Sequence, residues 1–129
     1  ARLAKMHEPT YLHQTMGRAK DGSIARFKDI PFAMAAIDQL RALEELRVHF
    51  HVPVNADRLS DELSTTNDHL KAALDVIAKT PGACRELEIE TYTWEVLPPE
   101  VRAADVADMI AEEYRWTLAE LAQRGVKPL

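Results

Sequence analysis

The sequence is short of several residue types, and each shortage narrows the classes of protein to consider. A single cysteine, Cys84, rules out an internal disulfide framework and fits a reducing compartment, so we expect a cytoplasmic protein in which Cys84 is a small buried hydrophobe. Aromatic residues make up only 6% of the chain and the net charge is −5, which argues against a nucleic-acid partner. There is no apolar run long enough to cross a bilayer and no signal peptide, so neither a membrane span nor secretion is expected.

Hydrophobic periodicity in the 129 residues predicts one α/β domain. Residues 11–16 and 24–27 are predicted to form a hairpin, because Asp21-Gly22 between them tolerates the positive φ of a tight turn. Residues 55–63 are expected to form an ordered loop. Three helices are predicted: one that opens at Pro31 and leads to Leu46, one over 65–80 with a capping box that starts at Thr65, and one over about 103–124.

Apolar residues at helical spacing predict which face of each helix is buried. The stripe of the first helix consists of Phe32, Ala36, Leu40 and Leu43, and that of the second of Leu70, Ala73, Leu74 and Ile77. In the third helix the stripe consists of Val106, Met109, Ile110, Tyr114, Thr117, Leu118 and Leu121. His13, in the hairpin, could serve a site, but it is interpreted as a solvent-facing residue.

Two further segments are the main functional clue, because each separates into an apolar and a polar face at the strand period of two. In segment 47–52 the polar face consists of Arg47, His49 and His51. In segment 87–94 it consists of Glu88, Glu90, Tyr92 and Trp94. The helix-length stretch between the segments predicts two adjacent parallel strands joined by a right-handed crossover.

Two imidazoles and two carboxylates on neighbouring parallel strands suit a divalent ion such as Zn²⁺ or Mn²⁺. His51 and Glu90 lie nearest the C-terminal strand ends, where ligands gather in parallel α/β folds, and are the predicted metal ligands. His49 and Glu88 lie one step deeper and are the predicted catalytic residues, since a carboxylate near a bound ion can move a proton on carbon. A half-exposed sheet whose polar face meets water fits the same pattern, and spacing alone leaves that alternative open.

The chain also resembles a known family over nearly its whole length. The motifs that carry the resemblance are Glu8-Pro9-Thr10-Tyr11-Leu12-His13-Gln14, Val48-His49-Phe50-His51-Val52-Pro53-Val54 and the run from Leu87 to Pro98, supported by Thr65-Thr66 and by Glu113-Tyr114-Arg115-Trp116. They are similar to the C-terminal part of the EboE family of metabolite-traffic proteins. That family belongs to the xylose-isomerase-like TIM barrels, the superfamily of sugar isomerases, epimerases and endonuclease-IV-type enzymes.

The resemblance implies a place for each segment in such a barrel. The histidine strand would be the seventh and the glutamate strand the eighth, and in the superfamily these strands carry a metal-binding histidine and a metal-binding glutamate. His51 and Glu90 are the nearest equivalents, with His49 the main rival of His51. Residues 1–30 would be a hairpin insertion and residues 31–129 the last β/α units. The chain would thus be a single partial domain without the earlier strands and their metal ligands.

The combined expectation is the C-terminal portion of a xylose-isomerase-like TIM barrel that uses Zn²⁺, Mn²⁺ or Mg²⁺ to isomerise or epimerise a sugar, sugar phosphate or related metabolite. Tyr92, Trp94 and Arg47 would contact the substrate. The open sheet edges of a partial barrel would favour self-association. Two other functions stay open: a metabolite carrier without turnover, favoured if upstream ligands are missing from the gene, and a small independent α/β interaction domain, favoured by a start codon close to Ala1.

Overall fold

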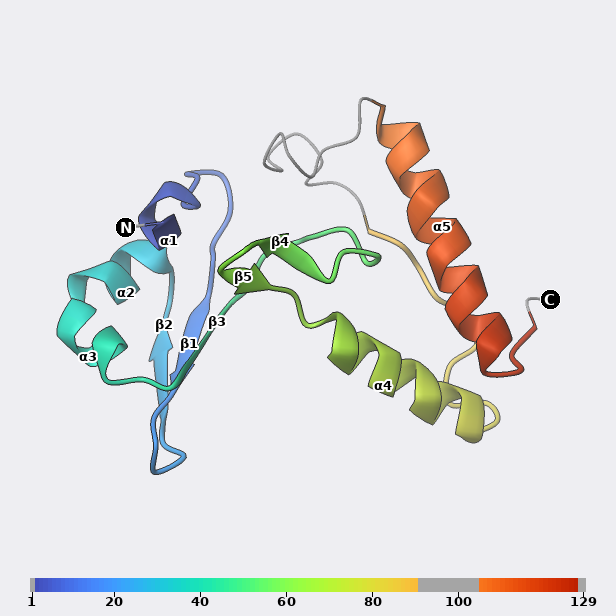
Figure 1. Cartoon of the computed structure of the whole chain (residues 1–129), viewed down its shortest axis with the longest axis horizontal. Helices are drawn as coiled ribbons and strands as arrows, with labels where there is room; N and C mark the ends of the chain where they lie inside the picture. Colours follow the sequence, from blue (N-terminus) through green and yellow to red (C-terminus); the bar gives the residue numbers. More distant parts are fainter. Residues whose placement is uncertain (1, 91–104, 128–129) are drawn as a thin grey trace. The chain divides into compact units, whose positions relative to one another are not determined.

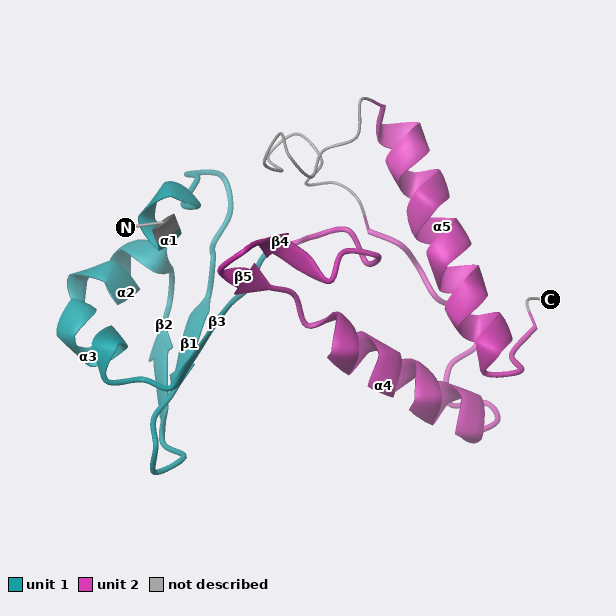
Figure 2. Ribbon diagram, viewed as in Figure 1, with its two compact units in different colours: residues 1–50 teal, residues 51–129 magenta. Residues whose placement is uncertain are grey.

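The computed structural model describes residues 2–90 and 105–127 and divides into two compact units (Figure 1). The first unit comprises Ala1–Phe50 and the second His51–Leu129 (Figure 2). Within the described ranges both units combine helices with small antiparallel sheets, and no closed barrel is present. None of the helices in those ranges is long and apolar enough to cross a membrane.

The first unit is built on a three-stranded antiparallel sheet in the order β2-β1-β3. Its strands are β1 (Thr15–Arg18), β2 (Ile24–Phe27) and β3 (Glu45–Val48). The pairing of β1 with β2 confirms the predicted hairpin, although β1 begins at Thr15 rather than Tyr11. Gly22 in the turn has a φ of 83°, a conformation that favours glycine. β3 pairs with the other edge of β1, with Arg18 opposite Glu45.

Three short helices belong to the first unit: α1 (Arg2–Lys5), α2 (Ile30–Ala35) and α3 (Ile37–Arg41). Asp29 caps α2 by accepting a hydrogen bond from the N–H of Ile30 at 2.7 Å, and Pro31 lies in the first turn as predicted. The prediction of one continuous helix is wrong, because Ala36 leaves the helical region (φ −102°, ψ 42°) and separates α2 from α3.

The buried apolar side chains of the first unit lie on α2, which contacts α1, α3 and β2. Ile30 and Ala33 are buried there, whereas Phe32 is 60% exposed, so the predicted stripe is wrong at this position. Gly17 in β1 permits a close approach, since a Cβ added to it would lie 2.0 Å from Cδ1 of Leu43. The missing side chain therefore leaves room for Leu43 to pack against the strand.

The second unit contains β4 (Arg58–Ser60), β5 (Leu63–Ser64), α4 (Asn67–Lys79) and α5 (Val106–Gln123). β4 and β5 pair antiparallel, so the loop predicted for residues 55–63 is in part a hairpin. Both helices lie within their predicted ranges. The N-cap of α4 is Thr66 rather than Thr65, whose hydroxyl instead accepts a hydrogen bond from the N–H of Asn67 at 3.3 Å.

Arg124, just after α5, connects the two long helices. Its Nε lies 2.6 Å from Oδ1 of Asp75 on α4, and its Nη1 lies 2.7 Å from Oε2 of Glu120 on α5. Lys71 of α4 also places its Nζ 5.7 Å from the ring centroid of Trp116 on α5, within the range of a cation–π contact. These contacts hold α4 and α5 together within the second unit.

The buried face of α5 differs from the predicted stripe. Met109 and Leu121 are buried as predicted, but Tyr114 is 52% exposed and Leu118 is 44% exposed. Glu113, which is 1% exposed, takes the buried position next to Tyr114. Successive side chains of a helix point about 100° apart. Burial of Glu113 in place of Tyr114 therefore shifts the buried face in the middle of α5. The middle of α5 thus contributes a carboxyl group to the interior.

The predicted pair of parallel strands is absent from the described residues. The histidine segment is a strand only as far as Val48 and pairs antiparallel with β1, followed by one more backbone hydrogen bond from the N–H of His49 to the carbonyl of Gln14 at 2.9 Å. Residues 87–90 form no strand, and residues 91–94 lie outside the described residues. The parallel prediction overlooked β1, whose free edge offers the backbone donors and acceptors that β3 pairs with.

Cys84, predicted to be buried, is exposed. Its thiol donates a hydrogen bond to the carbonyl of Glu86 at 3.0 Å. The prediction depended on Cys84 preceding a buried strand. The residues that follow it, as far as position 88, are exposed and form no strand, so no apolar layer forms to receive the thiol.

Candidate functional site

The structure brings together the two predicted metal ligands, His51 and Glu90. Nδ1 of His51 lies 3.5 Å from Oε2 of Glu90. The side chain of His51 is 29% exposed and that of Glu90 is 61% exposed. An imidazole nitrogen and a carboxylate oxygen therefore meet at a place that small solutes can reach.

The two residues lie in segments on either side of α4. His51 follows β3 closely, at the start of the second unit, and Glu90 follows the turn in which Gly82 has a φ of 81°. The second unit thus runs from the His51 segment through the β4–β5 hairpin and α4 to the Glu90 segment, and α5 comes later in the chain. Neither segment is a strand where it is described.

The spacing of the pair fits two ligands of one divalent ion. Ligand bonds near 2.1 Å place neighbouring ligand atoms about 3.0–3.5 Å apart, and the observed separation is 3.5 Å. Within residues 2–90 and 105–127, no group of three or more His, Cys, Asp or Glu side chains is arranged to hold a metal. Two side chains alone would supply only part of a coordination shell. When its imidazole is protonated, His51 can also form a solvent-screened ion pair with the carboxylate of Glu90 at this distance.

The predicted catalytic residues have different surroundings. Nδ1 of His49 lies 3.5 Å from Oε1 of Gln14, and both residues belong to the first unit. Glu88 is exposed and lies two residues before Glu90 in a segment without strand structure. Neither prediction is tested by these positions, because no substrate or ion defines a reacting atom.

Of the predicted substrate contacts, Arg47 is the one that the structure describes. It lies on β3, where its Nε donates a hydrogen bond to Oε1 of Glu45 at 2.6 Å. Its side chain is 50% exposed. Tyr92 and Trp94 lie outside the described residues.

A second polar arrangement holds the backbone of Val54, three residues after His51. The N–H of Val54 donates to Oε2 of Glu113 at 2.9 Å, and Nδ2 of Asn67 donates to the carbonyl of Val54. Both side chains are buried, with exposures of 1% for Glu113 and 6% for Asn67. We call Asn67, Glu113 and the Val54 peptide groups the Val54 clamp. It ties this segment to the start of α4 and to the middle of α5.

Each side chain of the Val54 clamp has one buried oxygen without a hydrogen-bond partner among the described residues: Oε1 of Glu113 and Oδ1 of Asn67. Burial raises the pKa of Glu113 above the ordinary 4.5, and the hydrogen bond from Val54 only partly opposes this rise. Sequence reasoning missed Glu113 as a site residue. Its position four residues after Met109, within the apolar phase of the helix, was the available signal.

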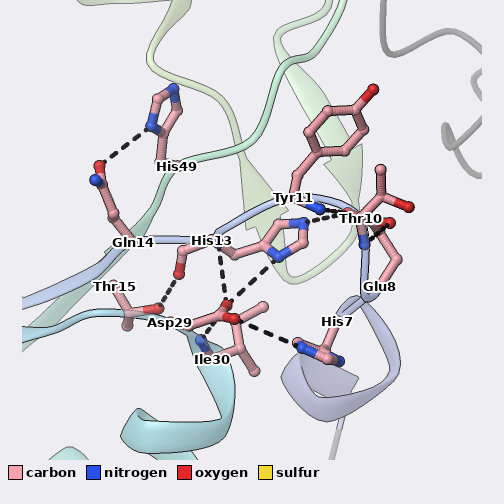
Figure 3. A network of polar contacts seen from close by, with 10 residues as sticks. All are labelled: His7, Glu8, Thr10, Tyr11, His13, Gln14, Thr15, Asp29, Ile30 and His49. Carbon is pink, nitrogen blue, oxygen red and sulfur yellow. Dashed lines mark hydrogen bonds and ion pairs between the residues drawn. The ribbon is translucent and has the colours of Figure 1, made fainter.

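The first unit contains a histidine–carboxylate network centred on His13 and Asp29 (Figure 3). Oδ1 of Asp29 accepts hydrogen bonds from the N–H groups of His13 at 3.0 Å and Ile30 at 2.7 Å. The ring of His13 lies between two carboxylates, with Nδ1 3.5 Å from Asp29 and Nε2 3.8 Å from Glu8. Nε2 of His7 lies 3.6 Å from Oδ2 of Asp29. The network thus fastens the chain before β1 to the start of α2.

His13 is 5% exposed, so the prediction that it faces solvent is wrong. Its ring packs against Phe50 at a centroid distance of 4.8 Å. The hairpin strand begins only at Thr15, and His13 belongs to the segment before it, where Asp29 binds the backbone. The turn signal at Asp21-Gly22 located the hairpin but carried no information about this contact across the unit.

Backbone N–H groups set the ionisation of both carboxylates in the network. Burial opposes ionisation of Asp29, but the N–H groups of His13 and Ile30, with the nearby His7, lower its pKa below the ordinary 3.8. Burial likewise opposes ionisation of Glu8, and hydrogen bonds from the two following N–H donors, at 2.8 and 2.6 Å, lower its pKa. Both groups are therefore anionic at neutral pH.

The three arrangements differ in what they can do chemically. The Val54 clamp and the His13 network hold backbone segments in place, and their central side chains are buried: Asn67 and Glu113 in the clamp, and His13 and Asp29 in the network. The His51–Glu90 pair is accessible and combines two donor types that bind divalent cations and transfer protons. Comparison with family models, with curated proteins and with solved structures finds nothing that matches this chain.

Proposed function

We propose that the chain is the C-terminal part of a divalent-metal-dependent TIM-barrel enzyme that isomerises or epimerises a sugar, sugar phosphate or related metabolite, in the biosynthesis or traffic of a secondary metabolite. The observation that carries the proposal is the 3.5 Å contact between Nδ1 of His51 and Oε2 of Glu90. Strand phase and ligand type single out the same two residues from the sequence. Although α4 lies between them in the sequence, the two side chains are in contact, which supports a common role.

Two further observations agree with this proposal. In the second unit α4 follows the His51 segment, after the β4–β5 hairpin, and α5 follows the Glu90 segment, as helices would follow strands in such a barrel. The motifs around His51 and Glu90 also resemble the part of the EboE family that corresponds to the last two barrel strands. In such a barrel the remaining metal ligands would come from other strands, which agrees with a pair that forms only part of a coordination shell.

In the proposed site His51 and Glu90 hold Zn²⁺, Mn²⁺ or Mg²⁺. When bound, the ion would polarise a carbonyl or a pair of hydroxyls of the substrate. The carboxylate of Glu88 would move the proton on carbon, and His49 would assist it or contact the substrate. Tyr92, Trp94 and Arg47 would line the pocket, since apolar and aromatic walls with a few polar groups are usual for such ligands.

Metal content tests this proposal. In the full-length protein, His51→Ala and Glu90→Gln should each weaken metal binding by about 10- to 100-fold, the usual loss when a ligand or its support is removed. The fold should persist in both variants, because the two side chains are partly exposed and do not belong to the buried core. Elemental analysis of the purified proteins after dialysis measures the loss.

Two matched controls lie in the same unit. His69→Ala removes an imidazole that is 58% exposed on α4, and Glu86→Gln neutralises an exposed carboxylate before the Glu90 segment. Both controls should retain wild-type metal content. Unchanged metal in His51→Ala and in Glu90→Gln would reduce the pair to a surface ion pair. Metal that binds at the pair without turnover of sugars would favour the carrier function instead.

A further inference from the structure

The segment that carries His51 is held at both polar backbone groups of one residue. The N–H of Val54 donates to Glu113 at 2.9 Å, and the carbonyl of Val54 accepts from Nδ2 of Asn67. Asn67 is the first residue of α4, and Glu113 lies in the middle of α5. Val54 is therefore fixed relative to the two helices of the second unit.

The chain between His51 and Val54 is short and stiff. Pro53 is buried, and the proline ring fixes its φ near about −65°. The carbonyl of Pro53 accepts a hydrogen bond from the N–H of Ala56 at 3.0 Å, which closes a turn directly after the segment. Because few free rotations separate Val54 from His51, a displacement of Val54 moves the imidazole as well.

We propose that Asn67 and Glu113 are positioning residues for the His51–Glu90 pair. By holding Val54 they keep the imidazole of His51 at the separation from Glu90 that one ion requires. This inference rests on the proposed function of the pair as metal ligands. Asn67 and Glu113 act through the backbone and need not touch the ion or a substrate.

The residue types at the two positions support a positioning role over simple packing. Position 113 lies on the buried face of α5 with Met109 and Leu121, where an apolar side chain would carry no desolvation cost. Glu113 and Asn67 each bury an oxygen that has no partner among the described residues. Unsatisfied buried acceptors destabilise a fold. The hydrogen bonds to Val54 account for a polar side chain at each position.

Four variants of the full-length protein distinguish a positioning role from simple packing. Glu113→Gln keeps an acceptor for the N–H of Val54 at nearly the same volume, and Glu113→Leu removes the acceptor at a similar volume. Asn67→Asp replaces the amide donor with an acceptor and still suits the first turn of α4. Asp68→Asn is the matched control, because Asp68 follows Asn67 in α4 and its side chain is 80% exposed.

Two readouts are compared across these variants. Nuclear Overhauser effects between the ring protons of His51 and the side-chain protons of Glu90 report the geometry of the pair in the absence of metal. Titration with Zn²⁺ alone reports its affinity. We expect Glu113→Leu and Asn67→Asp to lose most of the Overhauser intensity and to bind Zn²⁺ about tenfold more weakly. Glu113→Gln and Asp68→Asn should remain close to the wild type.

Unchanged Overhauser effects in Glu113→Leu and Asn67→Asp, or their absence in the wild type, would overturn the positioning role. Circular dichroism establishes that each variant keeps its helices. If Glu113→Leu does not fold, Asn67→Asp provides the test, because it leaves α5 unaltered. A wild-type protein that binds no Zn²⁺ while the Overhauser effects respond as expected would contradict the proposed metal function and leave the positioning role intact.

Discussion

Replacing Glu113 with alanine is expected to lower the free energy of unfolding by about 3 kcal/mol. The substitution leaves the N–H of Val54 without its partner and removes a buried side chain from the face that includes Met109. An unsatisfied buried donor costs about 1–3 kcal/mol, and the cavity adds to this cost. Urea unfolding followed by circular dichroism measures the change. A loss below about 0.5 kcal/mol, typical of a surface substitution, would contradict the buried hydrogen bond.

Glu113→Gln is expected to show how the ionisation of Glu113 affects stability. The pKa of Glu113 is raised in the folded protein, so the folded state binds the proton more tightly than the unfolded chain does. The stability that this group contributes is fully present below the ordinary pKa of 4.5 and is lost as pH rises through the raised value. Glutamine does not titrate. The variant should therefore gain stability relative to the wild type between pH 4.5 and neutral pH, and a constant difference over this range would disprove the raised pKa.

Asp29→Ala is expected to lower the midpoint of thermal unfolding by about 5–10 °C, the effect of losing a helix cap together with a second buried hydrogen bond. Asp29 accepts from the N–H of Ile30 at the start of α2 and from the N–H of His13 before β1. Alanine leaves both donors unpaired. A scan of ellipticity against temperature measures the midpoint, and an unchanged midpoint would show that the cap contributes nothing.

Asp29→Asn is the matched control, because asparagine is an equally good N-cap and keeps an acceptor for both N–H groups. Its midpoint should lie much closer to the wild type. Since the folded protein lowers the pKa of Asp29, the stability from its charge is present above the ordinary 3.8 and is lost as pH falls through the lowered value. The wild type should therefore lose its advantage over Asp29→Asn on acidification. An advantage that persists at low pH would contradict the ionised carboxylate.

Local signals in the sequence predicted the elements that local physics determines. Asp21-Gly22 located the hairpin, because the turn requires a positive φ at Gly22. Pro31 correctly predicted the first turn of α2. The spacing of apolar residues predicted the ranges within which α4 and α5 lie. These features depend on interactions between residues close together in the chain. They can therefore be predicted from the sequence without knowledge of the fold.

Features that depend on distant partners were predicted less well. The histidine segment alternates as a strand should, but alternation does not specify the partner, and β3 pairs with β1 rather than with a parallel neighbour. His13 and Glu113 are polar but buried, and each forms a hydrogen bond with a residue far away in the sequence. Asp29 accepts from the N–H of His13, and Glu113 accepts from the N–H of Val54. Polarity alone assigns such residues to the surface.

The structure brings two of the predicted site residues together. His51 and Glu90, chosen for strand phase and ligand type, lie in contact although neither segment is a strand where it is described. Nδ1 of His49, two residues before His51, lies 3.5 Å from Oε1 of Gln14. The strand ends at Val48, so the period of two no longer predicts the direction of the side chains that follow it.

The most direct test of the proposed metal pair is an anomalous difference map from crystals of the full-length protein grown with Zn²⁺ or Mn²⁺. The predicted result is a peak about 2.0–2.2 Å from both Nδ1 of His51 and a carboxylate oxygen of Glu90, the bond lengths of imidazole and carboxylate ligands. A peak elsewhere, with His51 and Glu90 still paired only with each other, would contradict it.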